Sequence, residues 1–232
     1  MPRSVLRALA GLTLPRVCLV CGRYTTANLD CCPDCEESLP ILNHRCLRCG
    51  LGTERPTQMC NTCLLGMPAF DLTWPGFEHA CLMQRWLRQF RGEANLTVGR
   101  FLSDVFARRL AGMGATRPDL LVPMPLHSID YFLQGFDHNR WLGQTLSKRM
   151  QHLPTHSALK LTRRIKKQHT LPTELRWANV KGAYAIRSLP PKTAHVALID
   201  DVMTTGHSVN EAAGVLKKAG VRRVDVWVLA RD

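Results

Sequence analysis

The sequence lacks the long apolar segments of a membrane protein. None of its uninterrupted apolar runs approaches the roughly 20 residues that cross a bilayer. The N-terminal stretch to Val17 is broken by arginines and a proline, and no small-residue cleavage site follows it, unlike an export signal. We therefore expect a cytoplasmic protein without a membrane span.

Acidic and aromatic side chains are both scarce. The chain has 18 Asp and Glu against 31 Lys and Arg, a formal net charge of +13. Two zinc ions held by four thiolates each would still leave about +9. The excess favours a polyanionic partner (nucleic acid, a phosphorylated metabolite or an acidic membrane surface), with a solvated basic surface as the alternative. Because only 6% of the residues are aromatic, a base-stacking platform is not indicated.

Cysteine is almost absent from most of the chain, and nine of the 10 cysteines lie between Cys18 and Cys63. A disulfide framework needs an oxidising compartment, so metal ligation is the better explanation, with a redox role as the alternative. Four Cys-x-x-Cys pairs begin every fourteen residues, and each such turn can direct two thiolates at one ion. The predicted ligands are Cys18, Cys21, Cys32, Cys35, Cys46, Cys49, Cys60 and Cys63.

Eight thiolates suit two structural zinc ions, each in a closed tetrahedral shell. Sequential pairing, first pair with second and third with fourth, is the simpler arrangement, but interleaved pairing fits equally well. Cys31 is left out because only Cys32 keeps the two-residue spacing to Cys35.

The pattern of the chain changes near residue 68. We predict a double zinc-ribbon module over residues 1–68 and, over residues 69–232, an α/β domain with a parallel-dominated sheet flanked by helices. Helices are expected at His79–Arg91, Asn95–Leu110, His138–Met150 and Ser208–Ala219, strands at Asp119–Val122, His195–Ile199 and Arg223–Leu229, and strand and loop at Lys160–Gln168 and Val180–Ile186.

Two adjacent acids, Asp200 and Asp201, follow the strand-like run Val196–Ile199. Ligands of open α/β sheets bind at the carboxyl ends of the strands, and paired carboxylates can accept hydrogen bonds from ribose hydroxyls and hold hydrated Mg²⁺. The hydroxyls, the glycine and the helix start that come next suit a phosphate, although an ordinary helix cap is the alternative. The predicted site comprises Asp200 and Asp201 as catalytic and binding residues, with Met203, Thr204, Thr205, Gly206, His207 and Ser208.

This segment resembles the signature of type I phosphoribosyltransferases, which bind phosphoribosyl pyrophosphate (PRPP). With the cysteine array, and with the segments 122–127 and 168–184, nearly the whole chain resembles the ComF/GntX family, which is linked to competence and the use of incoming DNA. The resemblance implies a type I phosphoribosyltransferase-like fold, PRPP with Mg²⁺ as ligand, single-stranded DNA as partner, and competence or DNA-processing proteins as further partners.

The resemblance also implies that residues 123–127 form a pyrophosphate loop, with Met124, Leu126 and His127 at the PRPP. The chain departs from the family further on. Gln134 stands where the family has arginine, and Asp137-His138 where it has Asn-Gln. Glutamine cannot neutralise a pyrophosphate charge, so turnover as a glycosyltransferase stays open.

A basic segment precedes the predicted phosphate site. It is interpreted as a lid over the substrate, as a track for a nucleic-acid backbone, or as a solvated charged face. The predicted nucleic-acid-binding residues of this basic segment are Lys160, Arg163, Arg164, Lys166 and Lys167.

Our first hypothesis for the function of the chain is a ComF-like PRPP-binding protein. The alternatives are a non-catalytic nucleic-acid adaptor and a metabolic nucleobase phosphoribosyltransferase.

Overall fold

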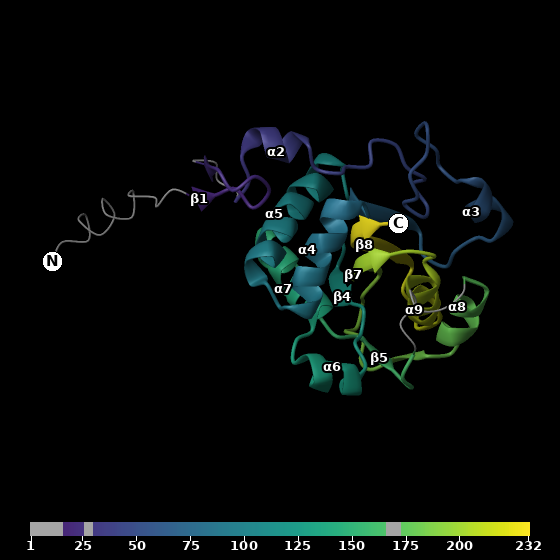
Figure 1. Cartoon of the computed structure of the whole chain (residues 1–232). Coiled ribbons are helices and arrows are strands. Elements are labelled where there is room, and N and C mark those ends of the chain that lie inside the picture. Colours follow the sequence, from purple (N-terminus) through teal and green to yellow (C-terminus); the bar gives the residue numbers. More distant parts are fainter. Residues whose placement is uncertain (1–15, 26–29, 166–172) are drawn as a thin grey trace. The chain divides into compact units, whose positions relative to one another are not determined.

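A computed structural model describes residues 16–25, 30–165 and 173–232 of the chain (Figure 1). The chain divides into two compact units, Met1–Leu39 and Pro40–Asp232. The domain boundary near residue 68 stays a prediction, and the division by contacts places the third and fourth Cys-x-x-Cys turns in the larger unit. No helix of the described part is long and apolar enough to span a bilayer.

The described residues of the smaller unit form two short strands and one short helix. Strands β1 (Arg16–Val17) and β2 (Tyr24–Thr25) pair antiparallel, and the short helix α2 (Pro33–Glu37) follows them. Proline suits the first position of α2 because no intrahelical acceptor faces that amide position.

The larger unit is built on a four-stranded sheet in the order β3-β8-β7-β4. All three pairings are parallel, and they join β3 (Leu72–Glu78), β8 (Arg223–Arg231), β7 (His195–Met203) and β4 (Leu120–Pro123). Parallel neighbours need crossover connections, which place helices on the two faces of the sheet. This architecture confirms the predicted fold class.

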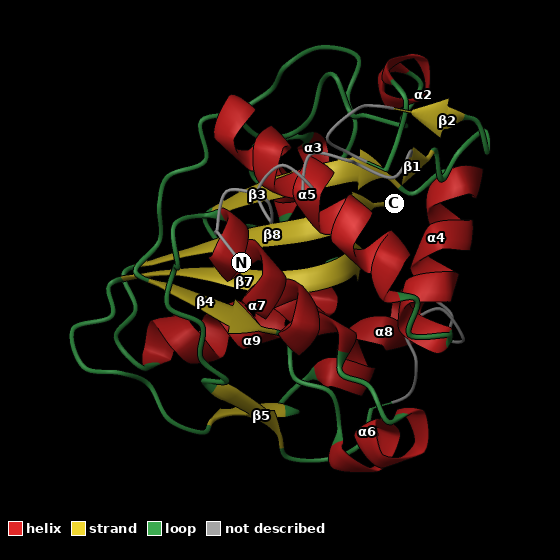
Figure 2. Cartoon of the chain, turned by 90° about the vertical axis from the view of Figure 1, so that its left-hand side faces the viewer, coloured by secondary structure: helices red, strands yellow, loops and turns green. Residues whose placement is uncertain are grey.

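Helices cover both faces of this sheet (Figure 2). Helices α4 (Cys81–Gly92), α5 (Leu96–Gly112) and α7 (His138–Arg149) share one face. Helix α9 (His207–Lys218) packs on the other, next to α8 (Thr173–Val180) and the hairpin of β5 (Leu159–Leu161) and β6 (Tyr184–Ile186). The short helices α3 (Asn61–Leu65) and α6 (Ser128–Gln134) lie outside these layers.

The central strand β7 is apolar because both of its faces are covered. Val196 and Leu198 pack in a cluster with α9, while Ala197 and Ile199 alternate to the opposite side. The predicted strand is confirmed, and it continues beyond Ile199 to Met203, so the two acids lie within the strand.

The edge strand β3 was not predicted from the sequence. It contains Pro75, whose missing amide proton is tolerated because β3 pairs on one side only. Gly76 is also required there, since a Cβ atom would lie 2.8 Å from Cδ2 of Phe106 and 2.9 Å from the carbonyl oxygen of Leu229. The four predicted helices are confirmed as α4, α5, α7 and α9. Residues 166–168 of the segment Lys160–Gln168, expected as strand and loop, lie outside the described part.

Candidate functional site

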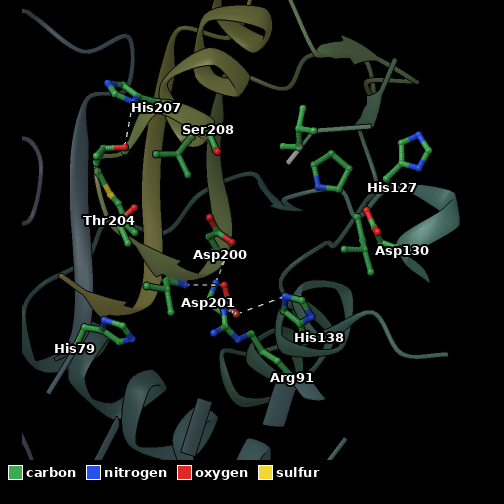
Figure 3. A pocket seen from close by; sticks show the side chains of 18 of the residues that line it. His79, Arg91, His127, Asp130, His138, Asp200, Asp201, Thr204, His207 and Ser208 are labelled. Atoms are coloured by element: carbon green, nitrogen blue, oxygen red, sulfur yellow. Dashed lines mark hydrogen bonds and ion pairs between the residues drawn. The ribbon is translucent and has the colours of Figure 1, made fainter. Parts of the chain in front are cut away.

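A cavity of about 710 Å³ lies at the carboxyl ends of β7 and β4 (Figure 3). The two acids of β7 and the following loop form one side of it. The segment after β4, from Pro125 to His127, contributes another wall, and Gln84, Arg88 and Arg91 of α4 contribute a third. The sheet edge expected from the sequence therefore carries a cavity.

The two neighbouring acids face different surroundings because consecutive strand residues point to opposite faces of a sheet. Asp201 is buried, and its Oδ2 lies 3.2 Å from Nη1 of Arg91 and 3.5 Å from Nε2 of His138. Burial alone would raise the pKa of Asp201, but the charges of His138 and Arg91 lower it below the ordinary value. Asp201 is thus ionised and held by α4 and α7.

Fewer favourable interactions offset the burial of the Asp200 carboxylate than offset that of Asp201. Burial, and then the charge of Asp201, raise the pKa of Asp200, and the hydrogen bond that Nδ2 of Asn139 donates to its Oδ1, at 3.0 Å, offsets this only in part. Asp200 lines the cavity. It is the acid of the pair that is better placed to accept a ligand's hydroxyl or to face a cation, which would restore its charged form.

The loop between β7 and α9 has the geometry of an anion site. Gly206 has φ +77° at the N-cap of α9, and a Cβ atom there would lie 2.6 Å from Cε of Met203. The amides of Thr204, Thr205 and Gly206 donate no hydrogen bond to any residue of the described ranges. Free amides at a helix N-terminus attract a phosphate.

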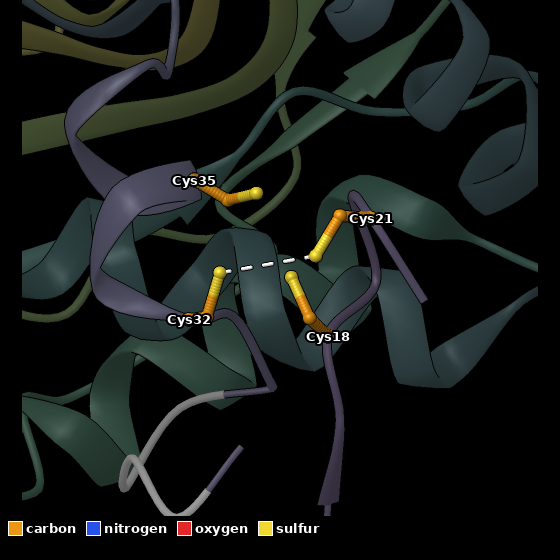
Figure 4. A group of neighbouring side chains, drawn as sticks. All are labelled: Cys18, Cys21, Cys32 and Cys35. Atoms are coloured by element: carbon orange, nitrogen blue, oxygen red, sulfur yellow. Dashed lines mark hydrogen bonds between the residues drawn. The ribbon is translucent and has the colours of Figure 1, made fainter. Parts of the chain in front are cut away.

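The cysteines form two groups of four, each with its sulfur atoms within 4.8 Å of one another. Figure 4 shows the sulfur atoms of the first group converging. The distance is 3.8 Å between the sulfurs of Cys21 and Cys32 and 3.7 Å between those of Cys49 and Cys60. A tetrahedral zinc ion with Zn–S bonds of about 2.3 Å requires sulfurs about 3.8 Å apart, so both groups fit zinc.

The pairing that the sequence left open is sequential. Cys18, Cys21, Cys32 and Cys35 make the first site, and Cys46, Cys49, Cys60 and Cys63 make the second. Cys31 belongs to neither group, and its thiol donates to the carbonyl oxygen of Cys32.

Comparisons with known proteins find a matching domain model and similar sequences. The model of the double zinc ribbon domain matches residues 9–64. The DNA utilization protein YhgH of Escherichia coli K12 is 28% identical over 95% of this chain and 99% of its own length. Competence protein F of Haemophilus influenzae is 25% identical over 92% of this chain and 96% of its own length. The resemblance to the ComF family is confirmed.

Solved structures similar to this chain include a purine phosphoribosyltransferase from Pyrococcus horikoshii. It is 14% identical over 58% of this chain and 82% of its own, with a TM-score of 0.35. The protein TT1426 from Thermus thermophilus is 17% identical over 56% and 72%, with a TM-score of 0.33.

Most of the residues that we predicted for the ligand site line the cavity, and one does not. Met124 is buried, and its amide donates to the carbonyl oxygen of Ile199 at 2.9 Å. His127 lines the cavity, but its Nδ1 accepts a hydrogen bond from the amide of Ile129 and caps α6. The predicted residues that line the cavity are Leu126, His127, Asp200, Asp201, Met203, Thr204, Thr205, Gly206, His207 and Ser208.

Two arginines of the basic segment make hydrogen bonds to other residues of the chain. Nη2 of Arg163 donates to two carbonyl oxygens, those of Asn179 and Lys181, both at 3.0 Å. Nε of Arg164 donates to Oδ1 of Asp130 at 3.1 Å, whereas Lys160 is exposed on β5. Two of the predicted nucleic-acid ligands therefore have partners inside the chain, and Lys166 and Lys167 lie outside the described part.

The side chains that surround the acids from α4 and α7 were not predicted from the sequence. His138 was singled out only as a departure from the family pattern, yet it lies against Asp201. Gln84, Arg88 and Arg91 recur at helical spacing on α4, and this spacing was the available signal that they share a face. Nothing in the sequence connects that face to β7.

Proposed function

We propose that this chain binds PRPP or a related ribose phosphate and acts in the use of incoming single-stranded DNA. The observation that supports this most is the loop after β7. Its three uncommitted amides lie next to Asp200 in one cavity, an arrangement that matches a phosphate joined to a hydroxylated sugar.

In this proposal each part of the loop has a task. The amides of Thr204, Thr205 and Gly206 and the start of α9 hold the 5-phosphate, with Ser208 at its rim. Asp200 accepts hydrogen bonds from the ribose hydroxyls. Asp201 keeps Arg91 beside the site through their ion pair.

A pyrophosphate group would meet the far walls of the same cavity. Leu126 and His127 line these walls, and Arg88 and Arg91 of α4 supply positive charge there, which offsets the missing arginine at position 134. Mg²⁺ would bind together with the pyrophosphate. Turnover would transfer the 5-phosphoribosyl group: a nucleophilic acceptor would form a bond to the anomeric carbon as the bond from that carbon to pyrophosphate breaks.

The DNA part of the proposal rests on charge and on the relatives. The similar proteins are named for DNA utilization and competence, and the chain carries a formal net charge of +13. Thiolate zinc ligands need a reducing compartment, so we assign the protein to the cytoplasm. Single-stranded DNA should bind in a salt-sensitive manner, with the affinity changing when PRPP is present.

The test of ribose phosphate binding is the substitution Asp200→Asn, which keeps the shape and removes the charge. Calorimetry with PRPP and Mg²⁺ should show affinity reduced about tenfold to a hundredfold, as expected for lost hydrogen bonds to a charged group. Asp104→Asn is the matched control, because Asp104 pairs with Arg149 on α7 and does not line the cavity. Wild-type affinity in Asp200→Asn would contradict the assignment, and pyrophosphate release measured in parallel reports turnover.

A further inference from the structure

A buried arginine connects the second four-cysteine site with the loop between β7 and α9. Arg231, near the end of β8, is 7% exposed and does not line the cavity. Its Nε donates to the carbonyl oxygen of Cys49 at 2.8 Å. Its Nη1 donates to the carbonyl oxygen of Met203 at 3.0 Å and also to that of Thr204. One guanidinium group thus joins a zinc-ligand turn to the first two peptide units of the loop.

These hydrogen bonds set the direction of the loop amides. In a planar trans peptide, the carbonyl group and the N–H group of the next residue point in opposite directions. Because the carbonyls of Met203 and Thr204 point at Arg231, the N–H groups of Thr204 and Thr205 point away from it. These are two of the three amides that have no acceptor among the described residues.

The anchor at the other end of Arg231 is rigid. The Cys49 sulfur belongs to the second four-cysteine site, and the next residue, Gly50, has φ +73°. Gly50 packs against Thr73 so closely that a Cβ atom would lie 2.7 Å from its Cγ2. The amide of Thr73 also donates to the carbonyl oxygen of Leu47 at 3.0 Å, within the same turn. A metal ion that holds this turn therefore also holds the carbonyl to which Arg231 is bound.

We propose that Arg231 is a positioning residue for the ribose phosphate site and that it makes phosphate affinity depend on the second four-cysteine site. The proposal rests on the proposed function, since it concerns the same loop. An arginine is required because its planar fork reaches carbonyl groups on two sides, which the single ammonium group of lysine cannot do. The first four-cysteine site belongs to the smaller unit, and the proposal does not extend to it.

The first experiment compares Arg231→Lys with Arg223→Lys, a control at the opposite end of the same strand. Calorimetry with ribose 5-phosphate should show affinity about tenfold weaker in Arg231→Lys and unchanged in Arg223→Lys. Pyrophosphate with Mg²⁺, which uses the other walls of the cavity, should bind both variants equally. A folded Arg231→Lys protein with wild-type affinity for ribose 5-phosphate would overturn the proposal.

The second experiment needs only the wild-type protein. Binding linkage is reciprocal, so saturating ribose 5-phosphate should slow the release of one of the two zinc ions to a coloured chelator several-fold. The slowing should be absent in Arg231→Lys, and unchanged zinc release in the wild type would overturn the proposal. If the wild type binds neither PRPP nor ribose 5-phosphate, the proposed function fails too, whereas normal binding without these effects removes only the role of Arg231.

Discussion

The two four-cysteine sites have the same spacing in the sequence and very different surroundings in the structure. The first belongs to a small unit, and Cys21 is exposed. In the second site, three of the four cysteines are buried in the hydrophobic core cluster of the larger unit, which also contains Phe70 and Val226. The same motif therefore has two settings: an ion in the first site would organise a small unit, and an ion in the second would belong to the core of the larger unit.

The difference between the two four-cysteine sites is tested most directly by removing one cysteine ligand from each site. Cys46→Ser should lower the unfolding midpoint of the larger unit by about 10 °C or more, because the metal cross-links a turn inside the core. Cys18→Ser should leave that midpoint unchanged, although each variant loses one zinc ion. Tryptophan fluorescence is the measurement, since all 5 tryptophans lie in the larger unit.

Zinc content, measured on each purified variant, is the control for this pair. If the two variants lost the same stability, the second site would be an appendage like the first. The distinction that we draw between the sites would then be wrong.

A subtler comparison uses the glycine that follows the first pair of cysteines in each site. Gly22 and Gly50 have nearly the same φ, +74° and +73°, so alanine costs each about 1 kcal/mol of backbone strain. A Cβ atom at Gly22 meets nothing within 4 Å, whereas one at Gly50 lies 2.7 Å from Cγ2 of Thr73. Gly50→Ala should therefore lower the midpoint of the larger unit by about 5–10 °C, and Gly22→Ala should not change it.

The clash at Gly50 also predicts a rescue. Thr73→Ser removes Cγ2 and keeps the hydroxyl that donates to the carbonyl oxygen of Arg48. The double variant Gly50→Ala with Thr73→Ser should regain part of the lost midpoint, because the two changes share one contact. Additive losses would show that the second turn does not pack on β3 as described.

Short segments of the sequence predicted many of the helices and strands of this fold. Strand β7 and the loop after it were predicted because strand, acids, glycine and helix start follow one another directly. Strand β3 was not predicted, because Pro75 and Gly76 interrupt the alternation of a strand. It forms because its partner β8 supplies the hydrogen bonds, and this cooperation between distant segments is not encoded locally.

Contacts between distant segments also limit how much of the candidate site the sequence predicts. The loop residues that would bind a phosphate lie within one short segment, so their spacing carries the signal. Asn139 contacts Asp200 across a separation of 61 residues, and Arg91 reaches Asp201 from another helix. Such contacts depend on how helices pack over the sheet, and a single sequence gives no measure of that packing.

The smallest expected effects come from one arginine beside each site. Arg48 donates from Nη2 to the carbonyl oxygen of Pro68 at 2.8 Å and lies 3.9 Å from Asp71, in partly buried surroundings. Arg48→Gln should lower the midpoint of the larger unit by only about 2–4 °C, the effect of one net hydrogen bond, because Asp71 keeps its short ion pair with Lys217.

Arg23 provides the contrast in the smaller unit. Its exposed guanidinium donates to the sulfur of Cys21 and lies 3.3 Å from Asp34, a pair that salt screens. Arg23→Gln should leave the tryptophan midpoint unchanged at every salt concentration and should only speed the release of the first zinc ion. If Arg23→Gln instead shifted that midpoint as much as Arg48→Gln does, the first site would be coupled to the core of the sheet domain, and the two sites would no longer differ in kind.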